Sequence, residues 1–160
     1  MGRLIMLVGL LAIAPAAAKQ STMTSEQARA IVAPLYEALN EPAKKDVVGL
    51  LAKGTNPDYR SCSTNQDCQN RDQLAERFKS FGSVIPNLHW RIIDIWTAGN
   101  RIVVRGEATG TPVAPLFGVA PTGRSFRTIS IDTFTVAHGK LSTAYHVENW
   151  VAAFDQIKQP

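Results

Sequence analysis

The feature that most limits the fold is a change of pattern near residue 86. After it, β-branched and aromatic residues gather in four segments bounded by Gly, Asn or Pro, at 89–96, 101–109, 125–136 and 140–147. Before it, apolar residues recur at helical spacing in 25–39, 44–52 and 71–80, and a short helix is expected at 149–157. Helices ahead of a run of strands predict an α+β fold, with N-terminal helices packed on a curved antiparallel sheet of four or more strands.

The N-terminal segment has a different character from the rest of the chain. Residues 4–18 read LIMLVGLLAIAPAAA without a charge, directly after Arg3. A basic start, a short apolar run and an Ala-x-Ala end are typical of a secretory signal peptide, and the run is shorter than the roughly 20 residues that span a bilayer. We therefore expect a signal peptide over 1–18, a single domain over 19–160, a periplasmic or secreted location, and no membrane attachment once the signal is removed.

The two cysteines, Cys62 and Cys68, lie in the polar stretch YRSCSTNQDCQNRD, which reads as a loop. In an exported protein such a nearby pair favours a disulfide that closes a small loop. A redox-active pair has two intervening residues, and zinc requires further ligands. We expect a disulfide and no metal site.

The charge and the absence of known motifs argue against nucleic acid as a partner and against a bound cofactor. The formal net charge of +4 comes from scattered Lys and Arg, and Lys44-Lys45 is the only adjacent pair of basic residues. No basic-aromatic motif of RNA-binding proteins occurs, so no nucleic acid is expected as a partner. The chain also has no phosphate loop and no GxGxxG, so no cofactor is indicated.

A resemblance comes from the second half of the chain. GTPVAPLFGVAPTGRSF, followed by IDTFTVAHGKLSTAYHVENW, resembles the SnoaL-like polyketide cyclases, or ester cyclases, mainly over 100–155. The turn Pro121-Thr122-Gly123 and the pair Gly139-Lys140 carry it. The family has the cone-shaped α+β fold of the nuclear-transport-factor-two-like, or cystatin-like, superfamily. The resemblance implies a pocket for a small apolar carbonyl compound and acid/base catalysis.

The resemblance also implies a catalytic pair. In the family, a His on the penultimate strand and an Asp on the last strand face the pocket; here these positions fall on Asp132 and His146, with the identities exchanged. A three-residue hairpin loop, Ala137-His138-Gly139, would place both side chains on one face, diagonally opposite each other. A two-residue loop, His138-Gly139, would place them on opposite faces. Gly at the third loop position favours the three-residue loop.

Four aromatic residues are candidates for contacting the ligand. Trp90 and Trp96 have the same parity in one strand, so both are expected to line a pocket, although an aromatic core is the commoner outcome. Phe134 and Tyr145 are the other two candidates, and Tyr145 carries a hydroxyl that can donate to a carbonyl. Glu148 shares the face of His146 if the strand continues.

A carboxylate beside an imidazole supports proton transfer next to a carbonyl. One hypothesis is therefore a cofactor-independent lyase or isomerase of the cyclase, isomerase or dehydratase type. Export argues against polyketide assembly itself, which is intracellular. The alternatives are a non-catalytic module that binds a small ligand and an accessory module that forms a homodimer.

Overall fold

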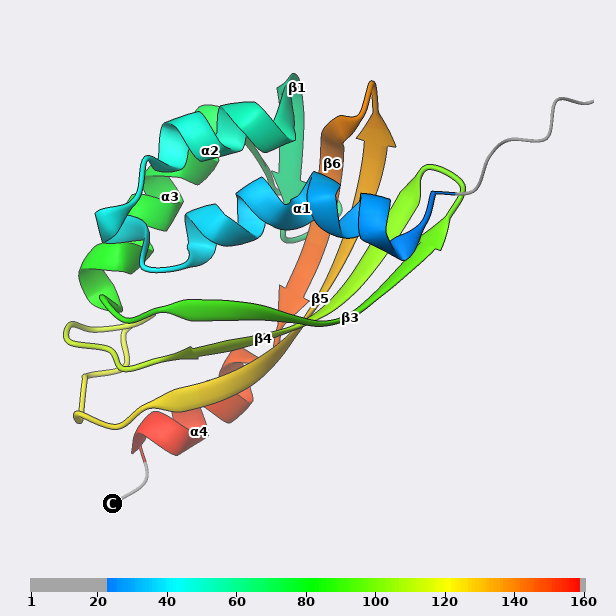
Figure 1. The fold of residues 1–160 in the computed structure, drawn as a ribbon. Helices are drawn as coiled ribbons and strands as arrows, with labels where there is room; N and C mark the ends of the chain where they lie inside the picture. The colour runs from blue at the N-terminus through cyan, green and yellow to red at the C-terminus, as the bar shows by residue number, and fades with distance from the viewer. Residues whose placement is uncertain (1–22, 159–160) are drawn as a thin grey trace, which may run out of the picture.

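The computed structural model describes residues 23–158, so the expected signal peptide at 1–18 lies outside the described residues. Within that range the chain forms helices and a single sheet (Figure 1). The helices are α1 (Ser25–Leu39), the 3-10 helix η1 (Pro42–Lys44), α2 (Val47–Gly54), α3 (Arg71–Val84) and α4 (Trp150–Lys158). The strands are β1 (Thr55–Cys62), β2 (Cys68–Asn70), β3 (His89–Ala98), β4 (Arg101–Gly110), β5 (Phe126–Ala137) and β6 (Lys140–Glu148).

The sheet has the strand order β2-β1-β6-β5-β4-β3. Strands β3 to β6 form the expected antiparallel meander, whereas β1 adds to β6 in parallel and β2 pairs antiparallel with β1. The fold is α+β as predicted, and its sheet is larger than four strands and mixed. Helices α1, α2 and α3 cover one face of the curved sheet (Figure 1). This inner face, between sheet and helices, holds the core.

The helices begin where the sequence indicates. The hydroxyl of Thr24 accepts from the backbone of Gln27, whose side chain accepts from Thr24 in return, and Asn70 forms the same capping box at α3. Helix α1 buries Val32, Leu35 and other apolar side chains against the sheet. Among the described residues, no helix combines the length and apolar character needed to cross a membrane.

The β5–β6 hairpin differs from the expected one. Ala137 pairs with Lys140, so the loop has the two residues His138 and Gly139, both with positive φ, and the prediction of a three-residue loop is wrong. A β-bulge then inserts Ser142 between the pairs formed by Leu141 and Thr143. The bulge shifts the register by one residue, which reverses the effect of the shorter loop. Asp132 therefore pairs directly with His146, and both lie on the inner face.

A second bulge changes the face of Trp96. In the β3–β4 pair, Ile92 pairs with Gly106 and Asp94 with Arg105, so Ile93 is the extra residue on β3. Beyond it, residues with the parity of Trp90 point to the other side of the sheet. Trp90 is buried on the inner face, whereas Trp96 is 52% exposed.

The polar stretch expected as a loop forms two strands. β1 pairs in parallel with β6, and the disulfide between Cys62 and Cys68, predicted from the sequence, links β1 to β2 at a position where the two residues pair. The polar composition and Pro57 hide this strand, which takes its backbone partner from β6 rather than from a neighbour in the sequence.

Candidate functional site

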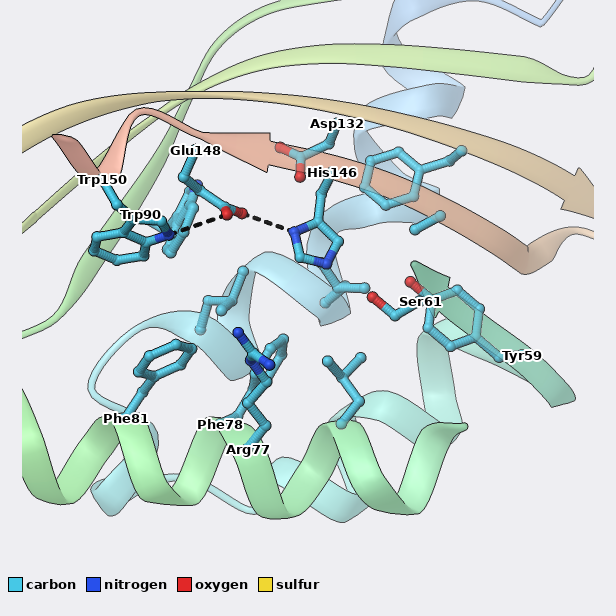
Figure 2. Close-up of a pocket in the computed structure, with 15 residues that line it drawn as sticks. Tyr59, Ser61, Arg77, Phe78, Phe81, Trp90, Asp132, His146, Glu148 and Trp150 are labelled. Atoms are coloured by element: carbon cyan, nitrogen blue, oxygen red, sulfur yellow. Dashed lines mark hydrogen bonds and ion pairs between the residues drawn. The ribbon is translucent and has the colours of Figure 1, made fainter. Parts of the chain in front are cut away.

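A pocket opens between the inner face of the sheet and helices α1 and α3 (Figure 2). Its free volume is about 50 Å³, enough for a few water molecules. The polar lining consists of Tyr59, Ser61, Arg77, Asp132, His146 and Glu148. The apolar lining is formed by Leu35, Leu39, Leu74, Phe78, Phe81, Trp90, Phe134, Ala144 and Trp150. Several titratable side chains in one small apolar pocket are the arrangement expected of a site for chemistry.

Asp132 is the buried acid of this pocket, with 8% of its surface exposed. Its Oδ2 accepts a hydrogen bond from the Tyr36 hydroxyl of α1 at 2.8 Å and one from the Ser130 hydroxyl at 3.0 Å. Burial raises the pKa of Asp132 to about 6, although both hydrogen bonds favour the ionised form. The carboxyl group therefore changes its protonation state close to neutral pH.

Ser130 is itself oriented by an aromatic residue. The Trp90 indole donates to the Ser130 oxygen at 3.2 Å, which leaves the serine proton for Asp132. The indole reaches across β4 at Gly106, where a Cβ atom would lie 2.4 Å from the Ser130 oxygen and 3.0 Å from the Trp90 indole nitrogen. Glycine at position 106 is thus required for the hydrogen bond between Trp90 and Ser130.

His146 is the second titratable group on this part of the inner face, and it pairs with Asp132 across the two strands. Its Nδ1 lies 2.8 Å from Oε1 of Glu148, whose Oε2 accepts from the Trp150 indole at 3.2 Å (Figure 2). Burial disfavours the charged imidazolium, but the hydrogen bond and negative charge of Glu148 outweigh burial and raise the pKa of His146. Glu148 also orients the ring, so Nε2 is the nitrogen available to a ligand.

The remaining walls differ in chemistry. From β1, Tyr59 and Ser61 bring two hydroxyl groups to the pocket, and the Tyr59 hydroxyl has no hydrogen-bond partner among residues 23–158. From α3, Arg77 extends toward the pocket with its guanidinium 5.4 Å from the centre of the Phe81 ring (Figure 2). No cluster of three or more metal-ligating side chains occurs in the described part of the chain.

The structure brings some of the predicted residues together and separates others. Asp132, His146, Trp90 and Phe134 line one pocket. Trp96 and Tyr145 do not, and the prediction that they line it is wrong. The bulge at Ile93 turns Trp96 outward, and Tyr145, which is 44% exposed, points outward because it neighbours the inward-facing His146 on the strand.

Sequence reasoning missed Tyr36, Tyr59 and Arg77. Tyr36 lies in the predicted first helix on its buried side, and a buried tyrosine hydroxyl needs a partner. Tyr59 and Ser61 alternate within the polar stretch, the only sequence signal that they share a face of a strand. Nothing in the sequence indicated that Arg77, one residue before the buried Phe78, extends toward the pocket.

Fold and site define a class: an α+β cone with a small-molecule pocket that holds a buried carboxyl group and an imidazole. The family comparison narrows this class. The family model for the SnoaL-like polyketide cyclases matches residues 32–157, and the chain belongs to that family. No curated protein matches the chain significantly.

Solved structures support the same fold. A protein from Jannaschia sp. CCS1, provisionally assigned as a SnoaL-like polyketide cyclase, superposes with a TM-score of 0.74 and 19% identity, covering 90% of this chain and 99% of its own. TsrD from Streptomyces laurentii gives 0.73 and 19%, covering 84% and 97%. IdmH from Streptomyces antibioticus, provisionally a polyketide cyclase, gives 0.69 and 23%, covering 81% and 97%. At these identities the likeness establishes the nuclear-transport-factor-two-like fold.

Proposed function

We propose that the protein is an exported acid/base catalyst that acts on a small, mainly apolar carbonyl compound in a cyclisation, isomerisation or dehydration. The observation that carries the proposal is the direct pairing of Asp132 with His146 inside one pocket. Such reactions need a group that removes a proton next to a carbonyl and a group that delivers a proton elsewhere.

Asp132 suits the role of the base. Its Oδ2 is held by Tyr36 and Ser130, and its Oδ1 accepts no hydrogen bond from the described residues, so that oxygen is free for a ligand proton. The pKa of Asp132 is about 6, so above this pH the carboxylate is ionised and can accept the proton from the carbon atom. Burial makes it a stronger base than an exposed carboxylate, because the charged form is poorly solvated.

His146 suits the role of the acid. The raised pKa, maintained by Glu148, keeps an imidazolium present near neutral pH, and Nε2 can donate its proton to a ligand oxygen. After these steps Asp132 holds one proton more and His146 one proton fewer than at the start. Both residues must be restored by exchange with solvent or by proton transfer with the ligand. In an isomerisation Asp132 gives its proton to another carbon of the ligand and the ligand oxygen returns its proton to His146, so no exchange with solvent is needed.

The pocket wall supports an apolar ligand of small size. Leucine and aromatic side chains from α1, α3 and the sheet surround the pair, and the free volume of about 50 Å³ excludes a large polycyclic ligand unless the side chains move. This favours a substrate smaller than the polyketides of the family name.

Export forms part of the proposal. The leader with Arg3 followed by an uncharged apolar run supports it. The Cys62–Cys68 disulfide is compatible with an oxidising compartment such as the periplasm.

The test is exchange of α-protons for deuterium in small enolisable ketones, from acetone to cyclohexanone, followed by proton NMR in D₂O. We expect the mature protein to accelerate exchange for at least one ketone, and His146→Ala or Asp132→Asn to reduce the rate at least a hundredfold. His138→Ala is the matched control, because His138 lies in the hairpin turn, away from the pocket, and should leave the rate unchanged. Wild-type rates in both site variants would remove the pair from the mechanism.

An alternative function is binding without turnover, which the small pocket also supports. Saturable ketone binding without exchange above the buffer rate would favour it. A homodimer is a further proposal, supported by exposed apolar residues of the sheet's outer face, Trp96, Ile131, Tyr145 and Val147. A single monomeric species in sedimentation velocity at micromolar concentration would exclude the dimer.

A further inference from the structure

Tyr59 has a hydroxyl group that the fold leaves unused. Its side chain is completely buried, and the hydroxyl oxygen forms no hydrogen bond with any residue in the range 23–158. Buried polar groups in native proteins nearly always have a partner, since an unpaired one loses its bonds to water without replacement. An exception at the wall of a functional pocket therefore indicates a partner that is not part of the protein chain.

The position of Tyr59 fits such a partner. β1 lies beside β6, and Ser61 pairs with Ala144, two residues before His146. Tyr59 and Ser61 are two residues apart on β1, so both side chains reach the inner face. Figure 2 shows the Tyr59 ring extending into the pocket with its hydroxyl near the Ser61 hydroxyl, on the side of His146. Both oxygens are thus presented to whatever binds beside the imidazole.

The second buried tyrosine of the pocket region makes the contrast clear. The Tyr36 hydroxyl is also buried, but it donates to Asp132 at 2.8 Å and is thereby fully engaged in holding the carboxylate. Tyr59 has the same phenol group, but its hydroxyl has no hydrogen-bond partner among the described residues. A role within the protein accounts for Tyr36 and leaves Tyr59 unexplained.

We propose that the hydroxyl groups of Tyr59 and Ser61 form a subsite for the carbonyl oxygen of the ligand, and that Tyr59 donates the hydrogen bond that stabilises negative charge on this oxygen. The inference rests on the proposed function, because it assigns the oxygen of the same ligand. It specifies the ligand further: the reacting carbonyl must lie toward β1, with its α-carbon toward Asp132.

The step that the subsite assists is enolisation. When Asp132 takes the α-proton, the electrons of the C–H bond form a carbon–carbon double bond and the π electrons of the carbonyl move onto its oxygen. Tyr59 keeps its proton throughout and shares it in a hydrogen bond with that oxygen. The step reverses when a proton returns to carbon, so no oxidant or further reactant is needed.

Tyr59 is suited to remain the donor. Burial raises the pKa of its hydroxyl above the ordinary value. A phenol that does not ionise in the working pH range keeps its proton available. Preorganised donors of this kind stabilise developing charge more effectively in an apolar pocket than in water.

Two variants, Tyr59→Phe and the matched Tyr36→Phe, test the inference by thermal unfolding and by binding of 4-nitrophenol at pH 8. The phenolate of this probe carries a negative oxygen on an apolar ring, and its absorbance reports binding. In Tyr59→Phe we expect an unchanged or higher melting temperature, because an unpaired buried hydroxyl is removed. We also expect affinity for the probe to fall about tenfold or more.

The control should behave in the opposite way in the unfolding experiment. Tyr36→Phe removes a partner of Asp132, so its melting temperature should fall below that of the wild type at pH 5, where Asp132 is mostly protonated, and at pH 8. A lower melting temperature in Tyr59→Phe with unchanged probe affinity would overturn the inference by showing a purely structural role. Failure of the wild type to bind the probe would overturn it as well.

Failure of the inference and failure of the proposed function are distinguishable. If Asp132→Asn abolishes ketone exchange while Tyr59→Phe alters neither exchange nor probe binding, the function stands and the subsite does not. If no ketone exchanges but Tyr59→Phe weakens probe binding, the oxygen subsite stands in a protein that binds without turnover.

Discussion

In part of their length, the two faces of strands β5 and β6 reverse the usual distribution of polarity. The inner face presents Ser130 and Asp132 from β5 with His146 and Glu148 from β6, whereas the outer face presents an apolar group of Ile129, Ile131, Tyr145 and Val147. An antiparallel sheet with one solvated face normally has apolar residues inside and polar residues outside. Polar groups inside cost stability unless they are paired, and here they have hydrogen-bond partners.

The outer face of β3 and β4 shows what charged groups do when they serve only as surface. Glu107 pairs with Arg91 at 2.9 Å and with Arg127 at 2.6 Å, and Asp94 pairs with Arg105. These pairs cross the strands in contact with solvent, where ion pairs contribute at most about 1 kcal/mol. The inner carboxylates, in contrast, have hydroxyl, indole and imidazole partners and no Lys or Arg partner among the hydrogen bonds described above.

The largest effect is expected from a substitution that disrupts the packing of the inner face. Phe134→Ala removes a fully buried ring beside Ala144, and we expect a loss of about 3–5 kcal/mol in the free energy of unfolding. Tyr145→Ala removes a ring of similar size on the outer face, at the next position of β6, and should cost less than about 1 kcal/mol. Urea unfolding measures both, and equal losses would contradict the assignment of the two faces.

A smaller effect of opposite sign is expected at Asp132. Its pKa is about 6 in the folded protein, against an ordinary value of 3.8 for an exposed aspartate, so burial of the ionised form opposes folding. The contribution is fully favourable below pH 3.8 and is lost as the pH rises through 6, and the difference between the two pKa values corresponds to about 3 kcal/mol. Asp132→Asn should therefore be more stable than the wild type at pH 8, by about 1–3 kcal/mol, and no more stable at pH 4.

The control for this prediction is Asp94→Asn on the outer face. Asp94 is half-buried and pairs with Arg105, so the variant should lose a few tenths of a kcal/mol at pH 8 instead of gaining. Urea unfolding at the two pH values separates the carboxylates. A gain in both variants would show that the effect does not come from the burial of Asp132.

The smallest change concerns the protonation of His146. Glu148→Gln removes the negative charge beside Nδ1, so we expect the pKa of His146 to fall. Because the raised pKa contributes stability at low pH that is lost as the pH rises through it, the variant should also be less stable below pH 6. NMR titration of the three histidines follows the pKa directly, with the His146 signal assigned by its loss in His146→Gln.

The matched control is Glu107→Gln, which removes a carboxylate from the outer face. It pairs with Arg91 and Arg127 and lies on the side of the sheet away from the imidazole, so the pKa of His146 should not change. An equal fall in both variants would mean that net charge, rather than the hydrogen bond to Glu148, governs the imidazole.

The hairpin shows how far the sequence allows prediction of the site. The expectation that Asp132 and His146 share one face rested on a three-residue loop, and a two-residue loop alone would have placed them on opposite faces. The loop length was wrong, and the bulge at Ser142 compensates for it. At β3 the bulge at Ile93 had no such compensation, and Trp96 was assigned to the wrong face. Bulges depend on strand pairing, which local composition does not encode.

β1 shows the part of the fold that sequence reasoning could not supply. Thr55 to Cys62 reads as a polar loop because its strand character comes from β6, which lies far later in the chain. With β1 unrecognised, Tyr59 and Ser61 had no place at the pocket. Contacts between distant segments also explain why Tyr36 was missed, since its partner Asp132 is 96 residues away.

The register set at the Ser142 bulge makes strand β6 intolerant of changes in length beyond the bulge. Removing Ala144 would shift the rest of β6 by one position, so His146 and Glu148 would turn to the outer face while Tyr145 and Val147 turned toward the pocket. Removing Ser142 would only remove the bulge and keep Asp132 opposite His146. Many surface hairpins lose or gain a residue near the turn during divergence with little effect. Here the loss of one residue beyond the bulge would replace the imidazole and carboxylate of β6 by an apolar pocket lining in one genetic event.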